Sequence, residues 1–252
     1  DRKRPDIAFV APISGRVAGL DYGPRRTLSS VRIEAGDAPP LKAEATGENA
    51  ESLRRTLLAR GLWPAFRSRP FGGIPAHDAE AAAIFVTAID TEPLAPDPKV
   101  VLAERMTDFH AGIAALKRLT RGPVYVCEAP NGPLAPDQPG VIRATFDGPH
   151  PAGLPGTHIH HLFDAGPTRP VWTIGYQDTA AIGTLLRTGI YPAERVVALA
   201  GPRVAKPRLI RTSRGVRLRD LTEGQLTPSP DGRVARVLSG SALTGREAAY
   251  LG

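Results

Sequence analysis

The sequence predicts a multidomain α/β protein, and three observations carry this prediction. Its 252 residues are enough for more than one domain. Apolar, strand-length segments alternate with amphipathic helical segments through the middle of the chain, which is typical of a mostly parallel sheet covered on both faces. Hydrophobic residues make up 42% and charged residues 23%, a globular composition rather than a disordered or membrane one.

The beginning of the chain predicts β structure. We expect a strand from residue 7, a turn at residues 12–15, a second strand to residue 23 and a third over residues 26–34. The polar, Pro- and Gly-bearing stretch over residues 35–50 then predicts a linker.

The middle of the chain predicts alternating helices and strands. Apolar residues at helical spacing predict helices, and Gly61 and Gly189 are placed to end two of them. Continuous apolar runs predict strands. The expected helices are 50–60, 98–120 and 179–188, and the expected strands are 81–90, 122–129 and 141–147. From residue 194 onward the pattern predicts a small α+β unit, in which the basic stretch Lys206–Asp220 is a strand with apolar residues between its arginines.

Composition excludes several functions. The net charge is +7, but aromatic residues are only 6% and do not interleave with the basic ones, so we expect no nucleic-acid partner. Cys127 is the only cysteine, which rules out an internal disulfide, a thiolate zinc site and a protein-held iron–sulfur cluster; in its apolar strand we expect a buried, inert thiol. No apolar run approaches the roughly 20 residues of a membrane span. With a charged start and no signal peptide, we expect an intracellular chain.

Nucleotide motifs are missing. The sequence has neither a G-x-G-x-x-G after a strand nor a G-x-x-x-x-G-K-[ST]. Prolines follow the strand at 81–90, so no tight glycine turn can present a helix N-terminus to phosphate there. The sequence predicts a sheet without a dinucleotide site.

Half of the six histidines lie in the segment GLPGTHIHH. If it is a strand, His158 and His160 point to one face and can supply two metal ligands, with His150, Asp164 or Asp178 as a third. The alternative is that the imidazoles bond to the backbone of a Pro- and Gly-rich loop.

Two other segments are candidates for a site. Asp90 and Glu92 end a strand, where they either serve a ligand or cap the turn that follows. The loop LWPAFRSRPFGG places aromatic residues beside Arg67 and Arg69. These residues suit a planar or anionic ligand, or the aromatics pack beneath the loop while the arginines stay solvated.

Long stretches of the chain resemble one family. GPHPAGLPGTHIH, VWTIGYQDTAAIG, RVVALAGPRVAKPRLIRT and RVLSGSALTG resemble segments of the NqrA family, the A subunits of the bacterial sodium-translocating NADH:quinone reductases. APISGRVAG, GLWPAFRSRPFGGIPA and AIFVTAIDTEPLAPDP resemble the same family, in the same order. The resemblance covers nearly the whole chain and implies that the chain is cut short at both ends relative to the family.

The resemblance implies a fold of three units. These are a partial barrel-sandwich β unit of the biotinyl-carrier kind (1–36), a Rossmann-like α/β domain without a dinucleotide motif (37–190) and a β-grasp domain (191–252). In flavin-binding relatives of this family a glycine-rich loop cradles FMN, whereas the corresponding loop here is bulky and rich in proline. We therefore expect no FMN, NADH, metal or iron–sulfur site on this chain.

The function implied is that of a peripheral subunit on the cytoplasmic side of the bacterial inner membrane, held against membrane subunits and contributing to ubiquinone binding. The isolated chain is then expected to be inactive. Candidate quinone contacts are Trp63, Phe66, Arg67, Phe71, His158 and His160. Two alternatives stay open: a purely structural scaffold of the same complex, and a stand-alone metal-dependent hydrolase that uses His158 and His160.

Overall fold

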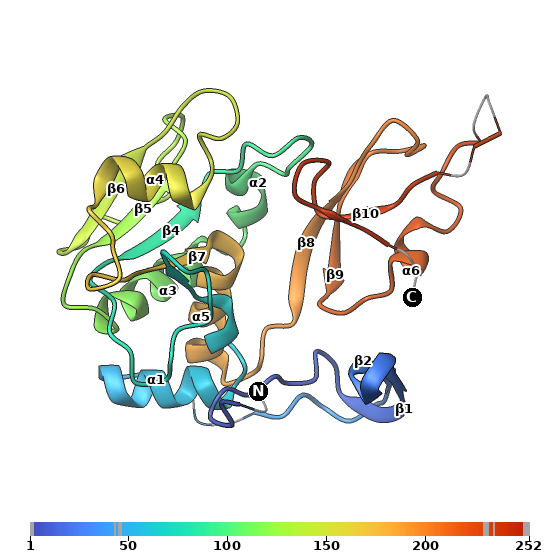
Figure 1. Ribbon diagram of the computed structural model, residues 1–252, viewed down its shortest axis with the longest axis horizontal. Helices are drawn as coiled ribbons and strands as arrows, with labels where there is room; N and C mark the ends of the chain where they lie inside the picture. Colours follow the sequence, from blue (N-terminus) through green and yellow to red (C-terminus); the bar gives the residue numbers. More distant parts are fainter. Residues whose placement is uncertain (1–2, 43, 45–46, 229–231, 234, 249–252) are drawn as a thin grey trace.

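A five-stranded sheet forms the centre of the chain (Figure 1). The computed structural model describes residues 3–42, 44, 47–228, 232–233 and 235–248. The strand order is β3-β7-β4-β5-β6; β3 is an antiparallel edge strand and the other four strands run parallel. This confirms the predicted, mostly parallel sheet. Its strands are β3 (Arg67–Arg69), β4 (Ile84–Ala88), β5 (Val124–Glu128), β6 (Val141–Thr145) and β7 (Val171–Gly175).

Helices cover both faces of this sheet, because apolar residues occupy both sides of its central strands. Ile84 and Val86 of β4 belong to the larger core cluster, which contains the apolar residues of α3 (Met106–Arg118) and α5 (Tyr176–Thr188). Phe85, between them, points to the opposite face and packs in a second cluster with Ile159 of α4 (Pro155–Leu162). The sheet is therefore the middle layer of three.

One of the predicted helices is split in the structure, and another ends where predicted. The segment 98–120 is not one helix but two, α2 (Pro98–Leu102) and α3, because the backbone of Arg105 leaves helical geometry with φ −123° and ψ 16°. The helix α5 ends as predicted at Gly189, whose φ of 72° is the left-handed conformation that glycine adopts without strain. The remaining helix of this part is α1 (Ala50–Ala59), and the short 3₁₀ turn η2 (Trp63–Ala65) follows it.

The predicted first strand, from residue 7, does not form. Ile7 is instead fully buried in the core cluster that contains Leu53 and Leu57 of α1, so burial in the α/β core replaces strand pairing. The other two strands form a ribbon of β1 (Gly15–Tyr22) and β2 (Leu28–Ala35), joined by the 3₁₀ turn η1 (Pro24–Arg26).

The C-terminal part is a set of short elements beside the sheet (Figure 1). They are β8 (Glu194–Leu199), β9 (Arg208–Ser213), α6 (Leu218–Thr222), β10 (Leu238–Ser239) and β11 (Arg246–Glu247). The strand expected over Lys206–Asp220 ends at Ser213, because Gly215 takes a φ of 77° and the chain then turns into α6. Nowhere in the described part of the chain is there a helix with the length and apolarity of a membrane span.

Candidate functional site

The histidines of THIHH lie on a helix, not on a strand. Because residues two apart on a helix point in nearly opposite directions, His158 faces the core and His160 faces solvent. The prediction that both point to one face is therefore wrong. Pro155 at the first helical position favours a helix here, since its fixed φ is already helical.

His158 has a structural environment. Its side chain is fully buried, its Nε2 lies 2.8 Å from the carbonyl oxygen of Ala152, and its ring centroid lies 4.3 Å from that of Phe146. Burial lowers the pKa of His158, while the contact with the Ala152 carbonyl raises it in part. The neutral imidazole thus anchors the loop that leads into α4. Among the described residues no group of three or more His, Cys, Asp or Glu side chains is placed to hold a metal ion.

The aromatic residues of the LWPAFRSRPFGG loop separate into buried and exposed ones. Trp63 and Phe66 are fully buried and pack on Trp172 of β7, with ring centroids 5.3 and 5.5 Å from it. Phe71, by contrast, is 82% exposed. Arg67 is exposed as well, and its guanidinium donates to the carbonyl oxygens of Pro64 and Phe66.

The sheet keeps the candidate quinone contacts apart. Arg67 lies on β3 at one edge, whereas His158 packs on Phe146, which follows β6 at the other edge. With strands spaced by ~4.8 Å, these edges are roughly 19 Å apart. The six residues therefore do not surround one ligand.

A hollow of about 640 Å³ lies beside α4 on the His160 side. His160 and His161 contribute imidazoles with ring centroids 5.2 Å apart, and Leu162 and Phe163 contribute apolar surface. The full lining is Gly156, Ile159, His160, His161, Leu162, Phe163, Asp164 and Ala165. The hollow is open to solvent, and its lining is more polar than apolar.

The carboxyl edge of the sheet gathers several of the sequence motifs. The strand order reverses between β4 and β7, and in open α/β sheets ligands bind at such a switch point. At this edge, hydrogen bonds between side chains and backbone join neighbouring segments of the chain. Thr91, just after β4, accepts the backbone N–H of Gly153 (2.9 Å) and lies 3.3 Å from His150 Nδ1, which fixes the loop before α4.

Glu92 connects this edge to the C-terminal part. Its carboxylate accepts hydrogen bonds from the hydroxyls of Ser241 and Thr244 in the segment SGSALTG. The bond from Ser241 is the main cause that lowers the pKa of Glu92, with smaller contributions from Thr244 and His150 and an opposing one from burial. Asp90, its neighbour, accepts the N–H of Glu92 (3.0 Å) and so has the capping role that was the alternative for this pair.

The YQD motif at the start of α5 holds strand β8. Gln177 pairs with Val196 as a strand would: its amide oxygen accepts the Val196 N–H (3.0 Å) and its NH₂ donates to the Val196 carbonyl (2.9 Å). Asp178 accepts from both Arg195 and Arg214. Burial raises the pKa of Asp178, and the charges of Arg214 and Arg67 lower it in part. Residues 17 to 152 positions apart in the sequence thus form one joint between the sheet and the C-terminal part.

Gln177→Ala is expected to loosen β8 without unfolding the sheet, because it removes both bonds to Val196. We expect hydrogen exchange at the Val196 amide to become about tenfold faster, the equivalent of one to two net hydrogen bonds. Gln177→Glu keeps an acceptor for the Val196 N–H but loses the donor. Its exchange rate at the Val196 amide should therefore lie between those of the wild type and Gln177→Ala. Gln225→Ala, which loses only a local 3.4 Å contact, is the control. Unchanged exchange at Val196 would contradict this role.

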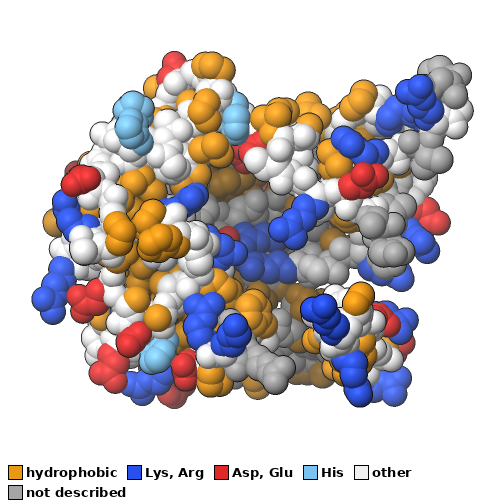
Figure 2. Space-filling model, viewed as in Figure 1, with side chains coloured by type: hydrophobic (Ala, Val, Ile, Leu, Met, Phe, Trp, Pro, Cys, Tyr) orange, Lys and Arg blue, Asp and Glu red, His pale blue; other side chains and the backbone are white. Residues whose placement is uncertain are grey.

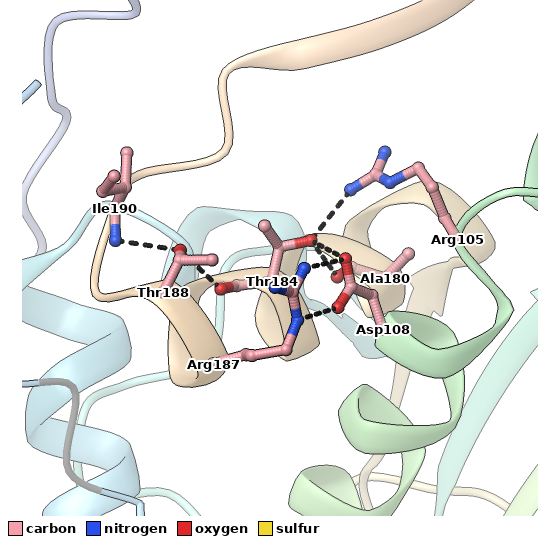
Figure 3. Close-up of polar contacts among 7 residues, drawn as sticks. All are labelled: Arg105, Asp108, Ala180, Thr184, Arg187, Thr188 and Ile190. Atoms are coloured by element: carbon pink, nitrogen blue, oxygen red, sulfur yellow. Dashed lines mark hydrogen bonds and ion pairs between the residues drawn. The ribbon is translucent and has the colours of Figure 1, made fainter.

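Sequence reasoning missed two buried acids. Glu128 ends β5 with no exposed surface and accepts from the N–H groups of Leu134 and Ala135 and from Arg143. Asp108 lies between α3 and α5 and is bonded by Arg187 and Thr184 (Figure 3). For Glu128 the available signal was an acid at the end of the apolar run VYVC, whereas the mixed segment RMTDFHAG gave no such signal for Asp108. Cys127 is buried as expected, and burial together with Glu128 raises its pKa to about 12, which makes the thiol inert.

Fold and site together define a class: an α/β scaffold in which a mostly parallel sheet is joined to a smaller β-rich part by hydrogen bonds and ion pairs at its carboxyl edge. Residues 48–191 match the family model described as the NqrA second alpha/beta domain, and residues 196–249 match the one described as the NQRA C-terminal domain. The chain therefore belongs to the NqrA family, the A subunits of the Na⁺-translocating NADH-quinone reductases.

Curated relatives agree with this assignment. The chain is 45% identical over 255 residues to the A subunit of the Na⁺-translocating NADH-quinone reductase of Neisseria meningitidis (serogroup A, strain Z2491), covering 97% of this chain and 56% of that protein. It is 46% identical over 264 residues to the corresponding protein of Pseudomonas aeruginosa PAO1 and 44% identical over 266 residues to that of Actinobacillus pleuropneumoniae L20; both matches cover 100% of this chain and 58% of the relative. The chain thus spans just over half the length of these relatives.

Proposed function

We propose that the chain is the greater part of a peripheral subunit of a Na⁺-translocating NADH:ubiquinone oxidoreductase, on the cytoplasmic side of the bacterial inner membrane. The observation that carries this proposal is the identity of about 45% to named NqrA proteins along almost the whole chain. NADH oxidation and sodium passage then belong to other subunits, and the isolated chain is inactive. Its partners are the membrane subunits of the complex.

The three-unit organisation belongs to the same proposal. We assign residues 1–36 to a partial barrel-sandwich unit, 37–190 to a Rossmann-like domain and 191–252 to a β-grasp domain. Trp63 and Phe66 fill the core at the loop where flavin-binding relatives carry a glycine-rich cradle, and this packing supports a chain without an FMN site of its own.

Ubiquinone contact is best placed at the hollow beside α4. His160 is exposed on its lining and can donate a hydrogen bond to a quinone carbonyl, while Phe163 and Leu162 offer apolar surface to the ring. His158 supports the site from within the core. Arg67 and Phe71 form a second, separate candidate at the β3 edge, and Trp63 and Phe66 act there only through the packing of the loop.

Calorimetric titration of the full-length subunit with ubiquinone-1 tests the quinone proposal. We expect saturable binding that His160→Ala weakens about tenfold, since one hydrogen bond and one ring contact are lost. His77→Ala, which removes an exposed imidazole elsewhere, is the matched control and should leave binding unchanged. Loss with Arg67→Ala alone would move the site to the β3 edge.

A purely structural role in the complex is the second candidate, and the joint at the carboxyl edge favours it. At the edge where an α/β sheet ordinarily receives a ligand, Glu92, Gln177 and Asp178 instead bond to the C-terminal part. A scaffold of this kind should bind its membrane partners and give no saturable heat with ubiquinone-1 in any of these variants.

A further inference from the structure

Two arginines contact one carboxylate at the start of α5, and a third arginine, Arg67, lies at the same edge of the sheet without contacting it. Arg195 of β8 and Arg214, just after β9, both donate to the same oxygen, Oδ1, of Asp178. Arg67 pairs in the sheet with Thr173, two residues before the N-cap of α5, and its charge also acts on Asp178. We call Arg67, Arg195 and Arg214 the arginine cluster.

The arginine cluster is not electrically balanced. Even with Asp178 ionised, three guanidinium groups against one carboxylate leave an excess of two positive charges. The side chains of Arg195 and Arg214 are only 18% and 30% exposed, so water solvates them poorly. Arg214 Nε is buried with no hydrogen-bond partner among the described residues. Arg195 and Arg214 share the single charge of Asp178, and poorly solvated cations with an incomplete counter-charge are costly, so the cluster favours an anion.

The position of the arginine cluster also suits an anion. It lies at the carboxyl edge of the sheet, next to the strand-order reversal between β7 and β4. The 13-residue helix α5 begins there directly after β7, and its N-cap, Gly175, supplies no side-chain bond to the first N–H groups. The N-terminus of a helix favours negative charge. In Figure 2, Lys and Arg side chains gather in the hollow between the sheet and the C-terminal part.

We propose that the arginine cluster binds a phosphate group. A phosphate dianion matches the two excess charges, and forked guanidinium groups bind phosphate oxygens in pairs. A phospholipid headgroup and a soluble phosphate compound share this chemistry. The site lies apart from the hollow beside α4 and shares only Arg67 with the second quinone candidate at the β3 edge, and its occupant would strengthen the contact between α5 and the β8–β9 hairpin.

Calorimetric titration of the full-length subunit with pyrophosphate, in chloride buffer at constant ionic strength, tests this proposal. We expect saturable binding that Arg67→Gln weakens about tenfold and that Arg67→Lys partly restores. Arg67 has no ion pair with a carboxylate among the described residues, and its guanidinium donates to nearby carbonyls, so its loss should leave the joint intact. The control is Arg121→Gln, which removes the same charge at the opposite, amino edge of the sheet beside β5.

Two results would overturn the proposal: no saturable heat with pyrophosphate, or equal weakening by Arg67→Gln and Arg121→Gln, which would reflect net charge alone. A second arm identifies the source of the phosphate. If the protein sediments with phosphatidylglycerol vesicles and pyrophosphate displaces it in the wild type but not in Arg67→Gln, the occupant is a lipid headgroup. Saturable pyrophosphate binding without vesicle binding assigns the site to a soluble phosphate compound.

Discussion

Gly183→Ala is expected to lower the free energy of unfolding by about 3 kcal/mol or more, although alanine is the better helix former. Helices α3 and α5 cross backbone to backbone. A Cβ on Gly183 would lie 1.8 Å from the carbonyl oxygen of Asp108, and one on Gly112 would lie 1.9 Å from that of Thr179. Neither backbone can move aside, so the helices must separate and open the core between them. Overpacking of this kind exceeds the gain of up to about 1 kcal/mol from helix propensity.

The measurement is urea unfolding of the 252-residue chain followed by circular dichroism. The matched control is Gly156→Ala in α4, where an added Cβ meets nothing within 4 Å. That variant should be as stable as the wild type or more stable by up to about 1 kcal/mol. A Gly183→Ala protein as stable as Gly156→Ala would contradict the tight crossing.

Asp108→Asn is expected to destabilise the chain by about 2–3 kcal/mol at pH 7, because a buried acceptor of three hydrogen bonds loses its charge. The Asp108 carboxylate receives the Nε and Nη2 groups of Arg187, at 2.8 and 3.1 Å, and the hydroxyl of Thr184 at 2.7 Å (Figure 3). An amide nitrogen in place of one oxygen would face a guanidinium donor. Asp164→Asn, at a side chain that is 98% exposed, should change stability by less than about 0.5 kcal/mol.

The cost of Asp108→Asn should also depend on pH. Burial raises the pKa of Asp108, but the bonds from Arg187 and Thr184 and the charges of Arg187 and Arg105 outweigh it, so the net pKa lies below its usual value. For a carboxyl with a lowered folded pKa, stability is present above the unfolded value of about 3.9 and is lost as pH falls through the folded value. Wild type and Asp108→Asn should therefore converge in urea unfolding as the pH falls below about 4. A constant difference would assign the effect to packing.

Local pattern was enough for much of the central sheet. The apolar runs around Phe85 and Val126 have strand length and are rich in β-branched and aromatic residues, which favours buried strands. Gly189 marked the end of α5 because few other residues adopt its φ without strain. The break at Arg105 could not be predicted, since nothing in its neighbours disfavours a helix; the backbone departs there from a helical pattern that is otherwise continuous. The alternation in THIHH resembled a strand, and the stronger signal was Pro155 opening a helix.

The site was harder to predict because its contacts join distant residues. Ser241 and Thr244 meet Glu92 about 150 positions away, and Gln177 pairs with a strand edge that only the fold brings near. The sequence showed that Asp90 and Glu92 are a pair of acids at the end of a strand, but it did not show which groups they accept hydrogen bonds from. Nor does spacing reveal that Gly112 and Gly183 allow two helices to touch. Composition did predict that the Cys127 thiol is buried, because a lone cysteine in an apolar strand most often packs as a small hydrophobic residue.

The β1–β2 ribbon has two unlike faces. Register shifts after Val17 and Asp21 keep three apolar cross-strand pairs on one face: Val17–Ile33, Leu20–Val31 and Tyr22–Leu28. Most of these side chains are about half exposed, including Val17 at 57% and Tyr22 at 56%. On the other face Arg16 pairs with Glu34, and Arg32 with Asp21.

This arrangement governs how the chain behaves in concentrated solution. The four charges on the two strands neutralise one another, which leaves only Arg25 and Arg26 of the turn η1 to keep two copies apart, while the apolar face adheres to any similar surface. Sulfate salts and warming from the cold strengthen such adhesion, and chaotropic solutes weaken it. We therefore expect the apolar face of the ribbon to lower the solubility of these 252 residues despite their net charge of +7.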